Sequence, residues 1–212
     1  MTAPTHKQYA IAFAFIANMM LFSYNITNIN YYLALPIILL TSKYGALFPD
    51  VDHSWKNVKD KSVPNWIINK IIHLTGGSHR SWQTHSIDIV VIVSLASYYL
   101  PSYLYTKGLV TVVNREVLSI LMLGFSAGWI SHIIADMFTS AGVRLLCFLK
   151  LKVKFVPKQL FGLRFNTGNE WEQFCYKLTR FINIILGIIC LIYPLIVNGT
   201  ISNLIDRLLD LF

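Results

Sequence analysis

The chain has 212 residues, of which 55% are hydrophobic and only 13% are charged, about half the charged share of an ordinary soluble domain. Together with several apolar runs close to the ~20 residues that cross a bilayer, this composition excludes an ordinary soluble domain and indicates an integral membrane protein. The net charge of +8 would favour nucleic acid in a soluble protein. Here the basic residues lie beside apolar runs, where they set orientation, so we expect a lipid bilayer and no nucleic acid as the partner.

The apolar runs predict an all-α membrane protein, a multi-pass helical bundle that forms one domain over residues 1–212. We expect four or five transmembrane helices, at residues 9–24, 30–48, 87–105, 117–136 and 181–197. Pro36 predicts a kink in the second span. Gly124 and Gly128, with the small residues between them, would permit close helix contact in the fourth span.

Two long polar connections, residues 49–86 and 137–180, separate these spans. Residues 66–74 predict a short amphipathic helix that could lie on the membrane surface, and residues 149–156 alternate as a small hairpin would. Residues 201–212 predict an amphipathic tail. Three cysteines without a CxxC pair predict reduced, buried thiols and no disulfide; they are Cys147, Cys175 and Cys190.

Threading the spans back and forth returns both long connections to the side on which the N-terminus starts. This thread predicts one metal-binding face that gathers His6, Asp50, Asp52, His53, His79, His85, His132 and Asp136. Every Lys and Arg except Lys107, Arg115 and Arg207 falls on the same face. The positive-inside tendency therefore predicts that this face is cytoplasmic.

Two of the acidic motifs have the spacing of metal ligands. His132 and Asp136 are four residues apart and share one helical face, at the end of an apolar span where ionisable groups are costly and usually functional. The alternative is a capped helix end with a satisfied histidine. Asp50, Asp52 and His53 occupy four residues, and alternate carboxylates can chelate one cation or bridge two. A turn built by aspartates would give the same pattern.

A third motif, residues 79–86, carries two imidazoles six residues apart, His79 and His85. Arg80 beside them could hold an anionic substrate oxygen as a fork, and Thr84 could fix the tautomer of a ligating ring. The alternative is a solvated loop at the membrane surface. His6 and His53 are weaker candidates, and His73 is interpreted as an interfacial residue that binds no metal.

Imidazole and carboxylate ligands together suit Zn²⁺ best, with Mn²⁺ or Fe²⁺ as alternatives, and suit Mg²⁺ or Ca²⁺ less well. Eight candidates exceed one tetrahedral shell of four. The sequence therefore predicts either two ions, or one ion whose ligands are hydrogen-bonded and oriented by the remaining candidate side chains.

These residues resemble the YdjM-like family, LexA-regulated inner-membrane proteins named as metal-dependent hydrolases. The family pattern has an N-terminal histidine, then L-P-D-(I or V)-D-H, H-R-x-x-T-H-S, S-H-x-x-x-D, T-x-x-G-x-x-L-L and T-G-S-x-x-E. The matching segments here are His6 and residues 48–53, 79–86, 131–136, 139–146 and 167–172. Gln83 is an extra residue in its motif, and Asn169 stands where serine is usual. The resemblance implies a bacterial inner-membrane protein and a metal-dependent hydrolase.

The expected reaction is hydrolysis by metal-activated water of an ester or phosphoester, such as a lipid or lipid-linked substrate. Asp52 or Asp136 would act as general base, and Arg80 and Arg144 would hold a phosphate or carboxylate. The predicted substrate contacts are Arg80, Thr84, Arg144 and Glu172. A transporter is one alternative, although it would need polar groups deep in the spans. A structural membrane protein that uses metal as a staple is the other.

Overall fold

The structure is a computed structural model, and it describes residues 1–24, 28–58, 61–149, 151–157, 159–160, 163–164 and 166–198. The predicted amphipathic tail at residues 201–212 lies outside the described residues. The expected helices and the predicted site residues fall on described parts of the chain, whereas the polar connections at residues 49–86 and 137–180 are described only in part.

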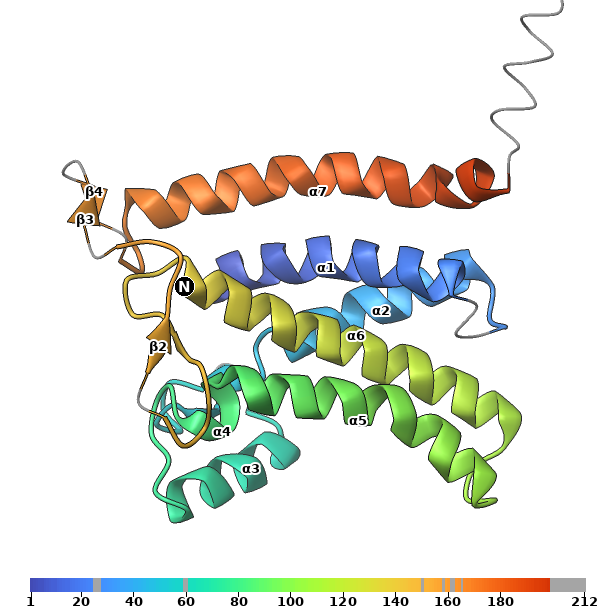
Figure 1. The fold of residues 1–212 in the computed structure, drawn as a ribbon, viewed down its shortest axis with the longest axis horizontal. Helices are drawn as coiled ribbons and strands as arrows, with labels where there is room; N and C mark the ends of the chain where they lie inside the picture. The colour runs from blue at the N-terminus through green and yellow to red at the C-terminus, as the bar shows by residue number, and fades with distance from the viewer. Residues whose placement is uncertain are drawn as a thin grey trace, which may run out of the picture.

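Five long helices run side by side along the molecule and alternate in direction (Figure 1): α1 (Ala3–Ser23), α2 (Tyr31–Gly45), α5 (Ile87–Thr106), α6 (Val112–Met137) and α7 (Glu170–Val197). Within the described residues, four segments are long and apolar enough to cross a membrane: Tyr31–Asp52, Ile87–Thr106, Val112–Met137 and Glu170–Val197. The predicted multi-pass helical membrane bundle is confirmed. Helix α1 is not among the four, and it packs between α2, α6 and α7.

Several helix boundaries differ from the sequence-based expectation: α2 ends at Gly45 and not at residue 48, α6 begins at Val112 and not at residue 117, and two further helices begin much earlier than expected. Helix α1 begins at Ala3 and not at residue 9, and α7 begins at Glu170 and not at residue 181. In both cases polar or amphipathic residues continue the helix beyond the apolar run, because a hydrophobicity pattern marks the lipid-facing length and not the whole helix. At the start of α7, Asn169 caps the helix by accepting a hydrogen bond from the main-chain N–H of Glu172. These extensions bring the N-terminal ends of both helices to the site.

Helices α2 and α6 approach closely enough that their main chains are in contact. A Cβ at Gly128 would collide with main-chain atoms of Ser42 and Ala46, and a Cβ at Gly124 would collide with Thr41 and Ile38. Glycine on α6 therefore permits this packing, as small residues do between membrane helices. The contact fixes α2 against the half of α6 that leads to His132.

Replacing Gly128 by Ala is expected to destabilise the protein by about 1–3 kcal/mol, because overpacking forces two helices apart. Thermal unfolding in detergent would measure the loss. Gly187→Ala on α7 is the matched control, since a Cβ there would meet only the ring of Phe15 at ordinary contact distance, 3.4 Å. Equal stability of the two variants would contradict the close α2–α6 contact.

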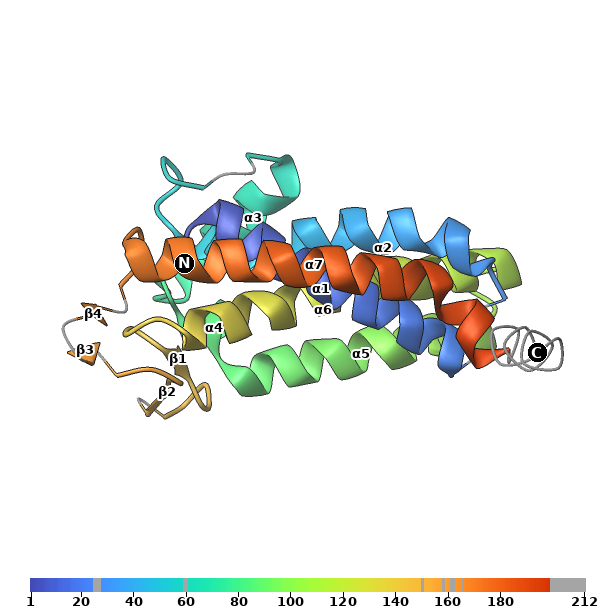
Figure 2. The same cartoon turned by 90° about the horizontal axis from the view of Figure 1, so that it is seen from above.

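The connections at one end of the bundle hold short elements: a 3₁₀ turn η1 (Pro49–Asp52), α3 (Val63–Leu74) and α4 (Trp82–His85). Strand β1 (Val143–Arg144) pairs antiparallel with β2 (Lys152–Val153), and β3 (Gln159–Leu160) pairs with β4 (Leu163–Arg164). A hairpin therefore forms in this region, but it pairs residues 143–144 with residues 152–153, so only its second strand lies within the predicted segment 149–156. The N-terminus of α1 lies at this same end (Figures 1 and 2), as the threading predicts.

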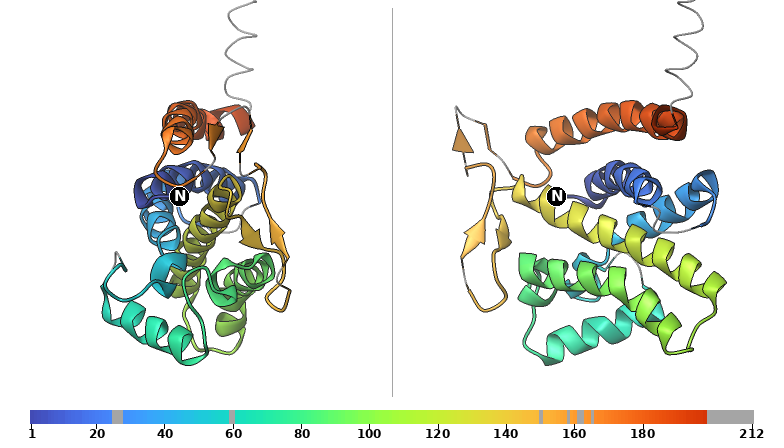
Figure 3. Two further views of the ribbon diagram at one scale, coloured as in Figure 1. Left: turned by 90° about the vertical axis from the view of Figure 1, so that its left-hand side faces the viewer. Right: turned by 45° about the vertical axis from the view of Figure 1, so that its right-hand side comes forward.

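Viewed along the bundle axis, α3 lies outside the five helices on one side and the β1–β2 hairpin lies on another (Figure 3). The end of the bundle between them is where the candidate ligands meet. All three cysteines are free, and Cys175 and Cys190 are buried as expected, whereas Cys147 is partly exposed.

Candidate metal centre

The structure brings all eight predicted ligands to one end of the bundle. His6 comes from the first turns of α1, Asp50 and Asp52 from η1, and His132 and Asp136 from the last turns of α6. His53 follows η1, His79 lies just before α4, and His85 ends α4. His6, His85, His132, Asp52 and Asp136 are each at most 1% exposed, a degree of burial that is rare for ionisable groups unless they are paired or bind metal.

Three groups of ligand atoms lie close enough to hold a metal ion, each with all its atoms within 4.8 Å of one another. The groups are His6, His132 and Asp136; Asp50, His85 and His132; and Asp50, His53 and His79. His132 belongs to the first two groups and Asp50 to the last two. The groups are therefore linked into one elongated cluster, larger than a single ion requires.

The centre of this cluster is the pair His85 and His132, whose Nε2 atoms face each other at 3.2 Å. The Nδ1 of His132 lies 2.6 Å from the carbonyl oxygen of Ala46, which can only accept, so this nitrogen carries the proton. The Nδ1 of His85 lies 3.1 Å from a carboxylate oxygen of Asp52, which assigns its proton in the same way. Two Nε2 lone pairs then point at each other, an unfavourable arrangement that a cation between them turns into a favourable one.

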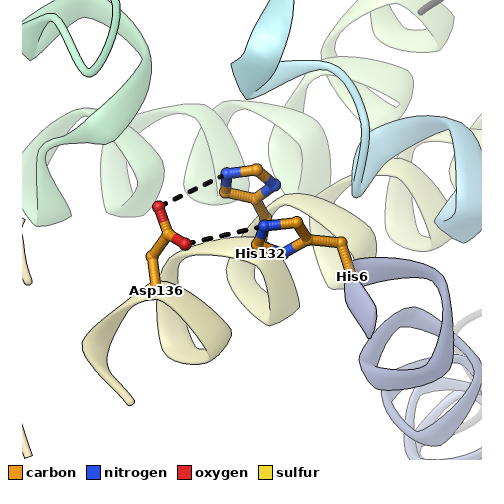
Figure 4. Close-up of side chains that lie close together, drawn as sticks. All are labelled: His6, His132 and Asp136. Carbon is orange, nitrogen blue, oxygen red and sulfur yellow. Dashed lines mark ion pairs between the residues drawn. The ribbon is translucent and has the colours of Figure 1, made fainter. Parts of the chain in front are cut away.

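Asp136 faces two sets of imidazoles with its two oxygens (Figure 4). Its Oδ1 lies 3.5 Å from Nε2 of His6, and its Oδ2 lies 3.9 Å from Nε2 of both His85 and His132. The rings of His6 and His132 stack with centroids 3.8 Å apart. Ligand atoms of one Zn²⁺, at Zn–N and Zn–O distances of roughly 2.0–2.2 Å, are separated by similar spans, so Asp136 could hold a metal ion together with these imidazoles. The main-chain nitrogen of Met1 also lies 2.6 Å from Oδ1.

Asp50 connects the centre of the cluster to its outer part. Its Oδ1 lies 3.9 Å from Nε2 of His132 and 4.0 Å from Nε2 of His53. The rings of His53 and His79 stack with centroids 3.5 Å apart. Burial, reinforced by the adjacent His79, lowers the pKa of His53 below its usual value, which keeps that ring neutral and able to ligate.

Asp52 lies behind the imidazoles and belongs to none of the three groups. Its Oδ2 accepts from the hydroxyl of Thr84 at 2.7 Å and from the main-chain N–H of Ser81 at 3.0 Å. The same carboxylate lies 3.1 Å from Nδ1 of His85 and 3.3 Å from Nδ1 of His79. Because it occupies the Nδ1 side of both rings, it turns their Nε2 atoms toward the cluster. The geometry places Asp52 where a residue orients ligands, and its predicted role as a ligand or base stays a prediction.

Arg80 lies at the open side of the cluster. Its Nη2 is 3.2 Å from Oδ2 of Asp136, while its Nη1 is buried and has no hydrogen-bond partner among the described residues. Its backbone has φ of +60°, a conformation uncommon for a residue other than glycine and often retained at functional sites. Arg80 lines a cleft of about 1170 Å³ together with Asp50, His79 and Asp136.

The other predicted substrate contacts lie elsewhere. Thr84 is buried, and its hydroxyl donates a hydrogen bond to Oδ2 of Asp52. Glu172 accepts hydrogen bonds from Thr2 and from the main-chain N–H of Gly168, so it fastens the start of α1 to α7. Arg144 is on β1 opposite Lys152 and is not among the described residues that line the cleft. Their roles in binding substrate stay predictions.

Sequence reasoning missed two groups that support the cluster. The carbonyl of Ala46 orients His132, and no side-chain pattern can reveal a main-chain acceptor. Asn69 donates from its side chain to the carbonyls of Val51 and His53. Its spacing of four residues from Asn65 on an otherwise apolar helix was a signal, because two amides on one face require partners.

Most of the chain is similar to known proteins. A family model described as "YdjM inner membrane protein" matches residues 1–203. The chain belongs to this YdjM family. It is 30% identical over 176 residues to "Inner membrane protein YdjM" of Escherichia coli (strain K12), covering 82% of this chain and 76% of that protein, and equally similar to the protein of the same name from Shigella flexneri. No solved structure matches it. All predicted ligands of this YdjM-family protein lie within the matched residues.

Proposed function

We propose that the protein is a membrane-bound, metal-dependent hydrolase that cleaves an ester or phosphoester. The observation that carries the proposal is the opposed Nε2 pair of His85 and His132, flanked by Asp50 and Asp136 beside an open cleft. A set of imidazoles and carboxylates favours Zn²⁺, with Mn²⁺ or Fe²⁺ next. When bound, such an ion lowers the pKa of a water molecule to about 7 and polarises a substrate oxygen.

The chain's own residues divide the remaining work. His132, Asp136 and Asp50 supply ligands that join neighbouring ion positions, and Asp52 orients His79 and His85. Asp52 is buried behind the rings, so it cannot reach a proton in the cleft. Asp50 is the carboxylate of the cluster that is most open to the cleft, with 21% of its side chain exposed, and we assign it the role of proton acceptor.

Arg80 would bind an anionic oxygen of the substrate. Its buried, unpartnered Nη1 is a donor that otherwise bears a desolvation cost, and a phosphate or carboxylate oxygen would satisfy it. The cleft lies at the end of helices that face lipid, which supports a lipid or lipid-linked substrate. The excess of basic residues at this end supports a cytoplasmic orientation in the bacterial inner membrane.

Arg80→Lys is expected to raise the KM for a phosphoester, and the inhibition constant of inorganic phosphate, by about tenfold or more, because a hydrogen bond to a charged group contributes roughly 1.5–3 kcal/mol. Steady-state kinetics would measure both constants. Arg180→Lys, exposed on α7 and outside the cleft lining, is the matched control and should leave them unchanged. An equal effect of both substitutions would refute the assignment of Arg80.

The purified protein is expected to contain at least two divalent ions per chain, since the three ligand groups share residues and no single ion can use all of them. Elemental analysis of protein purified in detergent would give the number, and dialysis against a chelator should lower the unfolding temperature by mass action. Glu170→Gln, an exposed carboxylate outside the three groups, should keep the full metal content. A metal-free protein with unchanged stability would contradict the proposal.

Two other functions are less well supported. A transporter would carry ionisable groups along its spans, whereas the candidate ligands lie together at one end of the bundle. A structural protein stapled by metal would need a closed coordination shell, whereas this cluster opens onto a cleft of about 1170 Å³.

A further inference from the structure

Helix α3 exposes most of its apolar side chains and buries two amides beside Ile72. Its buried face carries the amides Asn65 and Asn69, which are only 3% and 2% exposed. Its outward face carries Val63, Trp66, Ile67, Ile71 and Leu74, which are 46% to 85% exposed. A helix on a soluble protein turns such residues to the core, so this apolar stripe has a different, apolar surrounding.

The buried face of α3 holds the turn that carries Asp50 and Asp52. The side-chain amide of Asn69 donates to the carbonyl of Val51 at 2.6 Å and to the carbonyl of His53 at 2.8 Å. Nε2 of His73 lies 3.3 Å from the same His53 carbonyl. One side of α3 therefore fixes the main chain of the metal-site turn, while its other side is exposed among the described residues.

We propose that α3 is a lipid-contacting helix that couples the bilayer to the metal-site turn. The stripe of Val63, Trp66, Ile67, Ile71 and Leu74 would lie in the headgroup–acyl boundary. The exposed Lys61 and Lys70 would meet anionic phospholipid. The proposed coupling between the bilayer and the turn rests on the proposed metal site, whereas the proposed lipid contact of α3 does not.

Three observations favour lipid over a protein partner. The helix lies beside the site end of the bundle, obliquely to its axis (Figures 1 and 3), next to segments apolar enough to span a membrane. It is tied to one of these segments, because the hydroxyl of Tyr44 donates to the side-chain oxygen of Asn65. Finally, Lys70 lies 6.0 Å from the centre of the Trp66 ring, and tryptophan with lysine beside an apolar stripe is the composition of interfacial helices.

The lipid contact is tested by fluorescence quenching in vesicles of phosphatidylglycerol and phosphatidylcholine whose acyl chains are brominated. Wild type should lose more emission to the brominated chains than Trp66→Phe does, because Trp66 itself is quenched. Trp55→Phe is the matched control, since Trp55 packs against the buried cluster of Val51, Val58 and Ile72. Emission from Trp66 that is quenched by aqueous iodide and not by bromine would overturn the proposal and leave the stripe to a protein partner.

The coupling is tested by metal affinity in lipid nanodiscs. Asn69→Ala should weaken metal binding by roughly tenfold or more, as the loss of a residue that orients ligands does. Asn65→Ala, on the same buried face but bonded to Tyr44, should change it much less. Wild type should bind metal several-fold more tightly in anionic than in zwitterionic nanodiscs, and Lys61→Gln with Lys70→Gln should remove that difference.

Equal affinity of the two asparagine variants, or no dependence on lipid charge in wild type, would refute the coupling while the quenching result stands. Complete absence of metal binding in wild type would instead refute the proposed function. None of these measurements depends on turnover, so failure to find a substrate does not affect them.

Discussion

Asp136→Asn is expected to abolish turnover and to lower metal affinity by at least about a hundredfold. Both oxygens of Asp136 face imidazoles, Oδ1 toward His6 and Oδ2 toward His85 and His132, so under the proposed function the carboxylate would serve more than one set of ligands. Residues that only orient ligands cost roughly 10–100-fold in affinity or activity when they are removed. A bridging ligand should cost more, because the amide both removes a negative charge and places an NH₂ group against one ion.

Metal content and hydrolysis of a phosphoester panel would be measured on the same detergent-purified samples. His132→Ala should give a similar loss, since His132 belongs to two of the three ligand groups. Asp88→Asn is the matched control: this carboxylate also lies near a helix end, but it accepts from the main-chain N–H of Cys147 and faces no ligand group. If Asp136→Asn kept both its metal and the wild-type rate of hydrolysis, the proposed role of Asp136 in turnover would be refuted. Retained metal with no activity in wild type would favour the structural staple.

Which residues meet could be predicted from the sequence, because an even number of passes returns the chain to the side on which it started. Two spans return the chain to its starting side, so residues 49–86 and 137–180 and the N-terminus had to share one end, whatever the details of packing. His6 and Asp136 are 130 positions apart in the numbering, and yet their side chains approach to 3.5 Å. This part of the site depends on topology and on the number of long helices, and α1 has to be counted among them although it is not one of the four segments apolar enough to cross a membrane.

The division of roles within the site could not be predicted in the same way. Asp50 and Asp52 are two residues apart and chemically identical, but the 3₁₀ turn directs Asp50 to the cleft and Asp52 to the Nδ1 atoms behind it. Which carboxylate ligates depends on the turn's geometry. Glu172 likewise fell within a matching motif, but it is used to fasten Thr2 and Gly168, because the helical start of α7 extends further than its apolar run.

Asp52→Asn is expected to weaken metal binding by roughly 10–100-fold and to lower turnover to a similar extent, without removing a ligand. The carboxylate accepts from Thr84 and Ser81 and holds the Nδ1 sides of His79 and His85. An amide offers one acceptor in place of two, so at least one ring would lose the partner that fixes its tautomer. Its Nε2 would then be protonated for part of the time and unable to ligate.

The distinction between an orienting and a ligating role depends on comparing variants of the same carboxylate. If Asp52 acts through the rings, Asp52→Glu should bind metal more tightly than Asp52→Asn does, because a longer carboxylate still accepts from Nδ1–H groups. Thr84→Val should weaken metal binding less than Asp52→Asn does, since it removes only one donor to Oδ2. A loss as complete as that of Asp136→Asn, with no recovery in the Glu variant, would instead make Asp52 a direct ligand.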